Sequence, residues 1–198
     1  MSRNLMEWKS EPRQWQALPD GIRLTTDAGT DFWRHTHYGF VRDNGHFRFD
    51  TVDRDFELEV TIDGDYRDQY DQAGLMVRTD DEHWIKCGIE FVDDRELVSA
   101  VVTNRQSDWA VAPRTEAARG TPLRLALERK IDVVTISYGP SDHPTMLRMA
   151  PFATGATQAG IMAASPQGGG FEVTFTGFEL RQRETERSSA ASEGPHQL

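Results

Sequence analysis

The strongest constraint on the fold is a strict two-residue alternation in residues 84–91. Four apolar or small side chains take every second position, and the positions between them carry a different set: Ile85, Cys87, Ile89 and Phe91 against Trp84, Lys86, Gly88 and Glu90. Successive residues of a β-strand point to opposite faces of its sheet. The run therefore predicts a strand with one apolar face and one face equipped for chemistry.

The neighbouring segments continue the same alternation. Residues 73–78 and 98–103 alternate in the same way, and the linkers 79–83 and 93–96 are short and polar, as hairpin loops are. Pairing Arg78 with Trp84, and Val92 with Leu97, gathers the apolar side chains of all three strands on one side. The opposite face then carries Gln72, Met76, Arg78, Trp84, Lys86, Glu90, Ser99 and Thr103.

The rest of the chain reads as short strands separated by turns, without a convincing amphipathic helix. Strands are predicted over residues 22–26, 46–49, 55–62, 121–129, 131–138, 146–149, 159–164 and 171–180. Residues 31–40 and 104–113 are predicted to be loops. The first of them holds aromatic, Arg and His residues without a clear period, which is typical of a loop that covers a core edge or lines a cleft.

These patterns predict an all-β chain, a sandwich or jelly roll. Its 198 residues suit one domain, which we expect over residues 1–181. Residues 182–198 are rich in Ser, Glu, Arg and Gln, so we expect a disordered polar tail there.

Amino-acid composition limits the classes of binding partner and the cellular locations that are expected. The net charge of −10 argues against nucleic acid as the main partner, because phosphate binding depends on Lys and Arg. No run approaches the roughly 20 apolar residues of a membrane-spanning helix, and the first residues lack the apolar centre of a signal peptide. A single cysteine, Cys87, excludes an internal disulfide and falls on the apolar face, where a small core residue is expected. Together these features favour a cytoplasmic protein without a membrane partner.

Seven motifs, in this order, carry a resemblance to a known family: Asp31-Phe-Trp-Arg, Tyr38-Gly-Phe, Asp43-Asn-Gly-His, Tyr70-Asp-Gln-Ala-Gly-Leu-Met, Trp84-Ile-Lys-Cys-Gly-Ile-Glu, Leu97-Val-Ser-Ala-Val-Val-Thr and Ser107-Asp-Trp. Over roughly residues 5–181 the chain resembles the DUF1349 family, which includes proteins related to a yeast regulator of enolase. The resemblance implies a concanavalin A-like lectin/glucanase jelly roll of two curved antiparallel sheets, with the ligand site on the concave sheet. Because the family's biochemical function is poorly defined, the resemblance implies no reaction.

The equipped face is the main candidate site. Sugars are bound by an aromatic platform under the ring together with a few polar groups on the hydroxyls. The strand residues with these properties are Gln72, Trp84, Lys86, Glu90 and Thr103. Loop residues that would form the rim are Trp33, Arg34, Tyr38, Asp71, Asp108 and Trp109. The sequence therefore predicts non-catalytic binding of a carbohydrate or a similar polar small ligand.

Two other functions stay open. A glycoside hydrolase needs two carboxylates across the scissile bond, and Glu90 with Asp71 would supply them. The compact Glu-x-Asp-x-Glu strand motif of the related β-glucanases is missing, however. The kinship with an enolase regulator implies, instead, a regulatory module that acts on a metabolic enzyme.

Metals and cofactors are not expected. His35 and His37 share one side if their segment is extended, but no third ligand stands at a diagnostic spacing. Histidines in a loop more often form hydrogen bonds with neighbouring groups than bind a metal. The oligomeric state stays open, since exposed aromatic surface would permit a dimer.

Overall fold

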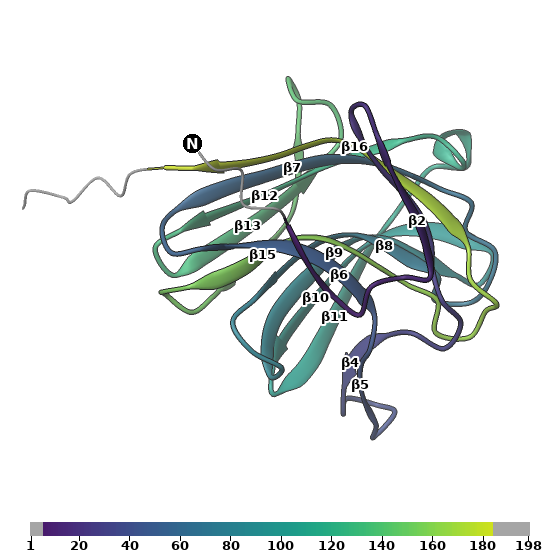
Figure 1. Ribbon diagram of the computed structural model, residues 1–198, viewed down its shortest axis with the longest axis horizontal. Coiled ribbons are helices and arrows are strands. Elements are labelled where there is room, and N and C mark those ends of the chain that lie inside the picture. The colour runs from purple at the N-terminus through teal and green to yellow at the C-terminus, as the bar shows by residue number, and fades with distance from the viewer. Residues whose placement is uncertain (1–5, 184–198) are drawn as a thin grey trace, which may run out of the picture.

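The computed structural model describes residues 6–183 and consists of two antiparallel sheets packed face to face (Figure 1). The first sheet has the order β1-β6-β15-β8-β9-β10-β11. Its strands are β1 (Glu7–Lys9), β6 (His46–Val52), β8 (Gln72–Arg78), β9 (His83–Val92), β10 (Arg95–Asn104), β11 (Gln106–Pro113) and β15 (Thr157–Ala164). The second sheet has the order β14-β13-β12-β7-β16-β3-β2. Its strands are β2 (Gln14–Leu18), β3 (Gly21–Thr25), β7 (Phe56–Gly64), β12 (Leu123–Lys130), β13 (Val133–Tyr138), β14 (Thr145–Pro151) and β16 (Glu172–Gln182).

Two small elements complete the described chain. The strands β4 (Phe32–Arg34) and β5 (Val41–Asp43) form a separate hairpin, which lies against the first sheet in the lower part of Figure 1. A single 3-10 turn, η1 (Glu116–Ala118), connects the two sheets. The predicted all-β sandwich is thus confirmed. Within residues 6–183, no helix has the length and apolar character needed to cross a membrane.

The predicted registers are right for one hairpin and wrong for the next. Arg78 pairs with Trp84 across β8 and β9, as expected. Val92 pairs with Arg95 and not with Leu97, so the β9–β10 pairing differs from the prediction by two residues. The connection is a two-residue turn, Asp93-Asp94, with φ angles of 50° and 60°. Asp tolerates this left-handed conformation better than most residues, and a shift of two leaves every side chain on its predicted face.

Several segments differ from the sequence prediction. The predicted loop 104–113 contains β11, an edge strand paired with β10. Two strands, β1 and β2, form before residue 22, where the sequence predicted none. The predicted loop 31–40 contains β4. At the other end, β16 continues to Gln182, the first residue of the predicted tail. Residues 184–198, the rest of that tail, lie outside the described residues.

The main core lies between the two sheets. It takes the apolar face of the central strands, including Leu75, Ile85, Cys87 and Ile89, and packs it against β7, β12 and β16. Burial raises the pKa of the Cys87 thiol to about 12, so the thiol stays protonated and unreactive at neutral pH. This is the small core residue that the alternation predicts.

A second apolar cluster covers part of the opposite, outer face of the first sheet. The hairpin contributes Phe32 and Trp33, which pack on side chains of five sheet strands: Phe47, Phe49, Met76, Trp84, Val101 and Met162. Phe32 meets Trp84 edge to face, with ring centroids 6.3 Å apart. The hairpin therefore buries part of the outer face, and a pocket forms beside it.

Candidate functional site

A pocket of about 220 Å³ lies on the outer face of the first sheet, at the edge of the β4–β5 hairpin. Five aromatic side chains form its walls: Trp33, Tyr38, Phe40, Tyr70 and Trp109. Its polar lining consists of Asp31, Arg42, Gln72, Lys86, Glu90 and Gln167, and Gly29 and Pro166 complete it. Ligand pockets usually measure ~300–1,000 Å³. The volume thus favours a small molecule about the size of one sugar ring over a polymer chain.

A pair of glycines lies on the outer face between residues of the polar floor. Gly74 and Gly88 are paired across β8 and β9, and a Cβ atom on either would overlap a backbone carbonyl of the other strand. The outer face therefore carries no side chains between the Met76–Lys86 pair and the Gln72–Glu90 pair, which leaves a depression there. Lys86 reaches across this gap, because its ammonium donates a hydrogen bond to Gln72 Oε1.

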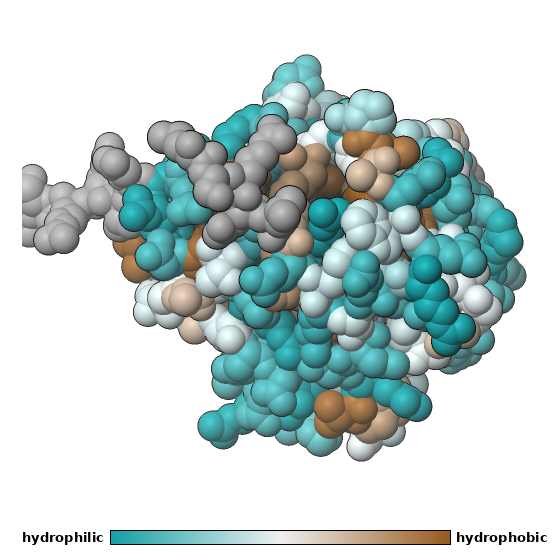
Figure 2. All heavy atoms as spheres, viewed as in Figure 1, coloured by the Kyte–Doolittle hydropathy of each residue, from teal (hydrophilic) through white to brown (hydrophobic). Residues whose placement is uncertain are grey.

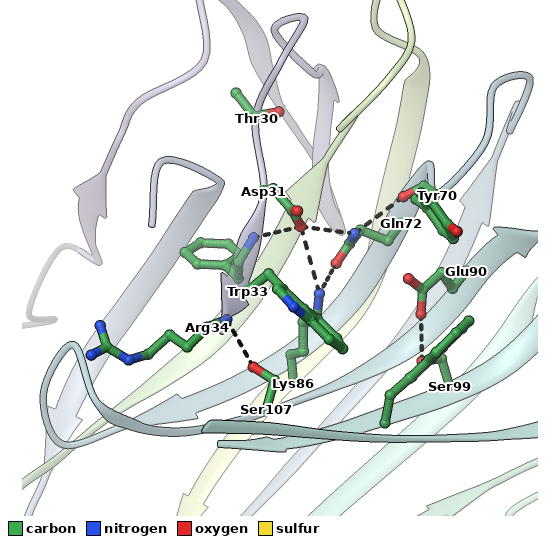
Figure 3. A network of polar contacts seen from close by, with 12 residues as sticks. Thr30, Asp31, Trp33, Arg34, Tyr70, Gln72, Lys86, Glu90, Ser99 and Ser107 are labelled. Carbon is green, nitrogen blue, oxygen red and sulfur yellow. Dashed lines mark hydrogen bonds and ion pairs between the residues drawn. The ribbon is translucent and has the colours of Figure 1, made fainter. Parts of the chain in front are cut away.

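The Lys86 ammonium is held by a short polar network (Figure 3). Besides Gln72, it lies 3.9 Å from Asp31 Oδ1. Gln72 Nε2 donates to the carbonyl oxygen of Tyr70 at 3.1 Å and to Asp31 Oδ1 at 3.4 Å. The same Asp31 oxygen accepts the backbone N–H of Phe32 at 2.7 Å. The network gives a cation with 3% exposure both a counter-charge and a fixed position.

Glu90 stands in a different environment on the same floor. Its Oε2 accepts a hydrogen bond from Ser99 Oγ at 2.7 Å, and Ser99 Oγ in turn accepts one from Trp109 Nε1 at 3.0 Å. Burial raises the pKa of the Glu90 carboxyl, while Lys86 and the Ser99 hydrogen bond act in the opposite direction. Among the described residues, no Lys, Arg or His nitrogen lies within 4.0 Å of this carboxylate.

The aromatic walls stand at steep angles to one another. The ring planes meet at 70° for Trp33 and Tyr38, 68° for Tyr38 and Tyr70, and 81° for Tyr70 and Trp109, with centroids 5.8–6.5 Å apart. The two Tyr hydroxyls are 2.9 Å apart, and this hydrogen bond together with burial raises the pKa of Tyr38 to about 12. The rings of Trp33, Tyr38, Tyr70 and Trp109 thus stand side by side around the floor, each at a steep angle to the next.

One wall residue, and the residue that precedes another, have strained backbone. Tyr70 has a φ of 68°, and His37, next to Tyr38, has a φ of 64°. A non-glycine residue in this region costs of order 1–3 kcal/mol and persists where its surroundings hold it. Such positions cluster at ligand sites, and here both of them orient rings of the pocket.

The structure brings six of the eleven predicted site residues to the pocket: Trp33, Tyr38, Gln72, Lys86, Glu90 and Trp109. Two others share the outer face but lie beneath its covering. Trp84 is 1% exposed under Phe32, so it packs as a core residue and offers no platform to a ligand. Thr103 is buried, and its hydroxyl bonds the Ser107 hydroxyl at 2.9 Å.

The remaining three predicted residues are engaged elsewhere. Arg34 extends away from the network in Figure 3 and pairs with Glu82 at 2.6 Å. Asp108 forms a surface ion pair with Arg148 at 2.7 Å. Asp71 is fully buried, and its carboxylate accepts hydrogen bonds from Arg67, Asp68 and Ser165. None of these three predicted residues (Arg34, Asp71 and Asp108) lines the pocket.

Sequence reasoning did not assign several lining residues: Gly29, Asp31, Phe40, Arg42, Tyr70, Pro166 and Gln167. Asp31 and Phe40 belong to the aperiodic segment 31–40, which was expected to cover a core edge or line a cleft. Tyr70 immediately precedes the predicted pair Asp71 and Gln72, so its place in the loop was the available clue. Pro166 and Gln167 follow β15, far away in the sequence, and nothing local marks them.

Metal ligands do not gather in the part of the chain that the structure describes: no three His, Cys, Asp or Glu side chains come together there. His35 and His37 both have positive φ angles in the tight turn between β4 and β5. Their segment is therefore not extended, and the shared side that an extended conformation would give them does not arise.

Comparisons with known proteins agree with this fold. The chain is 40% identical to Regulation of enolase protein 1 of Saccharomyces cerevisiae over 174 residues, which is 87% of each chain. A crystal structure of a functionally unknown protein from Saccharomyces cerevisiae superposes with a TM-score of 0.85 at 36% identity, covering 91% of this chain and 97% of the other. The carbohydrate-binding module CBM66 from Bacillus subtilis superposes with a TM-score of 0.59 at 14% identity, covering 90% and 98%. The last likeness concerns the fold alone.

The family model described as "Protein of unknown function (DUF1349)" matches residues 8–183, which is nearly all of the described chain. The motifs that suggested this resemblance lie in β4, β5, β6, β8, β9, β10 and β11 and in the loops beside them. They include the hairpin, the floor residues Gln72, Lys86 and Glu90, and the aromatic walls of the pocket. On these grounds, the chain belongs to the DUF1349 family.

Proposed function

We propose that this chain binds a small polar ligand, a carbohydrate or a molecule of similar size and polarity, in the outer-face pocket and does not transform it. One observation carries the proposal: five aromatic walls surround a floor on which Gln72, Lys86 and Glu90 offer fixed donors and acceptors. Apolar faces beside a few oriented polar groups are what a sugar ring requires. A fold shared with a carbohydrate-binding module supports the same proposal.

The surroundings of Asp71 support binding over glycoside hydrolysis. Its Oδ2 accepts the backbone N–H groups of Arg67 and Asp68 at 3.0 and 2.9 Å, and its Oδ1 accepts the Ser165 hydroxyl at 2.6 Å. The Asp71 side chain has 0% exposure, and its carboxylate accepts three hydrogen bonds, so its structural role is to stabilise the loop 67–71. It is not available beside Glu90 as the second carboxylate of a hydrolase.

A titration of pocket variants tests the proposal. Purified protein is titrated calorimetrically with a panel of monosaccharides, sugar acids, amino sugars and polyols at up to millimolar concentration. We expect at least one member to bind, and Trp109→Ala to weaken it on the order of tenfold or more, since buried aromatic contacts dominate such sites. Trp15→Ala is the matched control, because Trp15 is a partly exposed tryptophan that packs on Trp8, away from the pocket.

Two results would contradict the proposal. One is the absence of binding across the whole panel. The other is equal loss of affinity in the Trp109 and Trp15 variants, because this would place the ligand outside the pocket.

The second candidate function is regulation of a metabolic enzyme by direct contact. The yeast relative's name supports it, and so does an exposed apolar tip on the β4–β5 hairpin. Tyr38, Phe40 and Val41 are 44%, 40% and 43% exposed, and Figure 2 shows apolar atoms at the lower edge where Figure 1 places this hairpin. A cytoplasmic location, which the single buried thiol supports, belongs to this candidate as well.

Binding to purified enolase, measured by biolayer interferometry, tests this candidate. We expect Val41→Ser to weaken the contact. Ile131→Ser, a change at an even more exposed apolar residue outside the hairpin, should leave it unchanged. Light scattering on the same samples reports self-association through the tip. A dimer that Val41→Ser dissociates, without any enolase contact, would count against regulation by contact.

A further inference from the structure

Building on the proposed function, we propose that the ligand of this pocket carries a positively charged nitrogen, and that Glu90 is its counter-ion. The class is a small organic ammonium, either an amino sugar or a short alkylammonium. Both sources share the same chemistry at the pocket. The inference starts from the unequal pairing of the two charges on the floor.

The positive charge on the floor already has its partners. Lys86 donates to Gln72 and lies 3.9 Å from Asp31, and Asp31 also accepts from Phe32 and Gln72. An anionic ligand would have to displace this network to reach the ammonium. Because the network is fixed by backbone as well as side-chain groups, Lys86 offers little to an anion.

The negative charge on the floor has no ion pair within 4.0 Å among the described residues, and Lys86 attracts it only from a longer distance. Glu90 is 6% exposed, and Ser99 donates a hydrogen bond to its Oε2, with Trp109 beside it. Its other oxygen, Oε1, accepts no hydrogen bond from the described residues, although Glu90 lines the pocket. A buried carboxylate without a cation is costly, and a ligand cation would offset that cost.

The aromatic walls suit the same ligand. Trp109 donates its N–H to Ser99, which ties the ring beside Glu90. Tyr70 stands at 81° to Trp109, and Tyr38 at 68° to Tyr70. Rings arranged at steep angles around a carboxylate form an aromatic cage, in which π-electron faces and the anion both attract an ammonium group.

Two cations line the pocket and oppose a cationic ligand. The Lys86 charge is balanced by Asp31, as described above. Arg42 is exposed, and its guanidinium lies 5.7 Å from the centroid of the Phe40 ring at the rim, where solvent screens its field. The chain as a whole carries a net charge of −10, which attracts cations at longer range. Of the two carboxylates that line the pocket, Glu90 is therefore the one without a close ion pair.

Two matched pairs of probes test the inference on the unmodified protein. Choline is compared with its neutral carbon isostere, in which a tert-butyl group replaces the trimethylammonium group. Glucosamine is compared with glucose. We expect one charged member to bind about tenfold or more tighter than its neutral partner, a factor that corresponds to ~1.4 kcal/mol of charge recognition. Which pair responds distinguishes the alkylammonium from the amino sugar.

The role of Glu90 is tested with Glu90→Gln, which keeps a carbonyl acceptor for Ser99 and removes the charge. We expect the affinity for the charged probe to fall about tenfold more than the affinity for the neutral probe. Glu172→Gln, a change at an exposed carboxylate on β16, is the control and should change neither. Circular dichroism confirms folding, and the comparison of probes on the unmodified chain stands even if the variant fails to fold.

The outcomes separate this inference from the proposed function. Equal or tighter binding of the neutral probes would overturn the cationic ligand and leave a polar-ligand pocket in place. Charge discrimination that survives Glu90→Gln would overturn the role of Glu90. If none of the four probes binds, the cationic ligand is rejected, and the sugar panel then decides the proposed function separately.

Discussion

Replacing Glu90 by Gln should stabilise the folded protein at neutral pH, because burial disfavours the ionised carboxylate. The ordinary pKa of the Glu90 carboxyl is 4.5, and in the folded state it is raised by burial. Folding therefore favours the protonated form. At pH values below 4.5 the side chain is neutral in both states and carries no penalty. As the pH rises through the folded-state pKa, the full penalty develops and the stability of the unmodified protein falls relative to the variant.

The size of the effect follows from the same linkage. A pKa shift of one unit corresponds to somewhat more than about 1 kcal/mol of folding free energy. In a chain of this length, 1 kcal/mol changes Tm by roughly 2–4 °C. Gln preserves the acceptor for Ser99 Oγ, so the hydrogen bond at 2.7 Å is not lost with the charge. We expect the variant to melt above the unmodified protein at pH 8, by roughly 2–4 °C for each kcal/mol of penalty that the substitution removes.

Urea and thermal unfolding of both proteins from pH 4 to pH 8 measure the difference. The difference between the two free energies of unfolding should be near zero at the acid end and grow with pH. Glu172→Gln should show no such trend and stay within about ±0.5 kcal/mol, the usual range for surface changes. The reasoning is refuted if Glu90→Gln destabilises the protein at pH 8, or if its effect is the same at every pH.

Three further perturbations follow from the floor and the core. Gly88→Ala should destabilise the protein by about 2 kcal/mol or more, because the added Cβ would overlap the carbonyl oxygen of Ala73; urea unfolding checks this, and a loss below about 0.5 kcal/mol would mean that the two strands separate easily. Lys86→Met should cost about 1–3 kcal/mol, since it removes the donor to the buried Gln72 amide; a stability unchanged from that of the unmodified protein would show that water satisfies Gln72 instead. The Cys87 thiol, whose pKa burial raises to about 12, should not react with a thiol reagent until the protein unfolds; rapid labelling of the native protein at pH 8 would contradict its placement in the core.

The alternation of the sequence was enough to predict which face each central side chain occupies. Gln72, Lys86 and Glu90 share the outer face, as their even spacing requires, and Cys87 lies in the core. The register of β9 on β10 was not predictable from loop length. Its turn is formed by Asp93 and Asp94 at positive φ, a conformation that the sequence signals more clearly with Asn or Gly.

Periodicity also says nothing about what covers a face. Trp84 has the spacing of an exposed aromatic platform, yet the β4–β5 hairpin buries it under Phe32. The hairpin itself was predicted as a loop, because Trp33 and its neighbours follow no period. The edge strand β11 was missed for a related reason: Val111 is 45% exposed, so the strand lacks a continuous apolar face.

The short strand β4 links the pocket wall to the sheet. Phe32, with no exposed surface, anchors the hairpin in the outer cluster, while Trp33 beside it faces the pocket. A ligand that binds Trp33 therefore stabilises the docked hairpin by mass action, and undocking must release the ligand. Amide hydrogen exchange in β4 and β5 should accordingly slow when the pocket fills, which makes the hairpin a built-in reporter of occupancy.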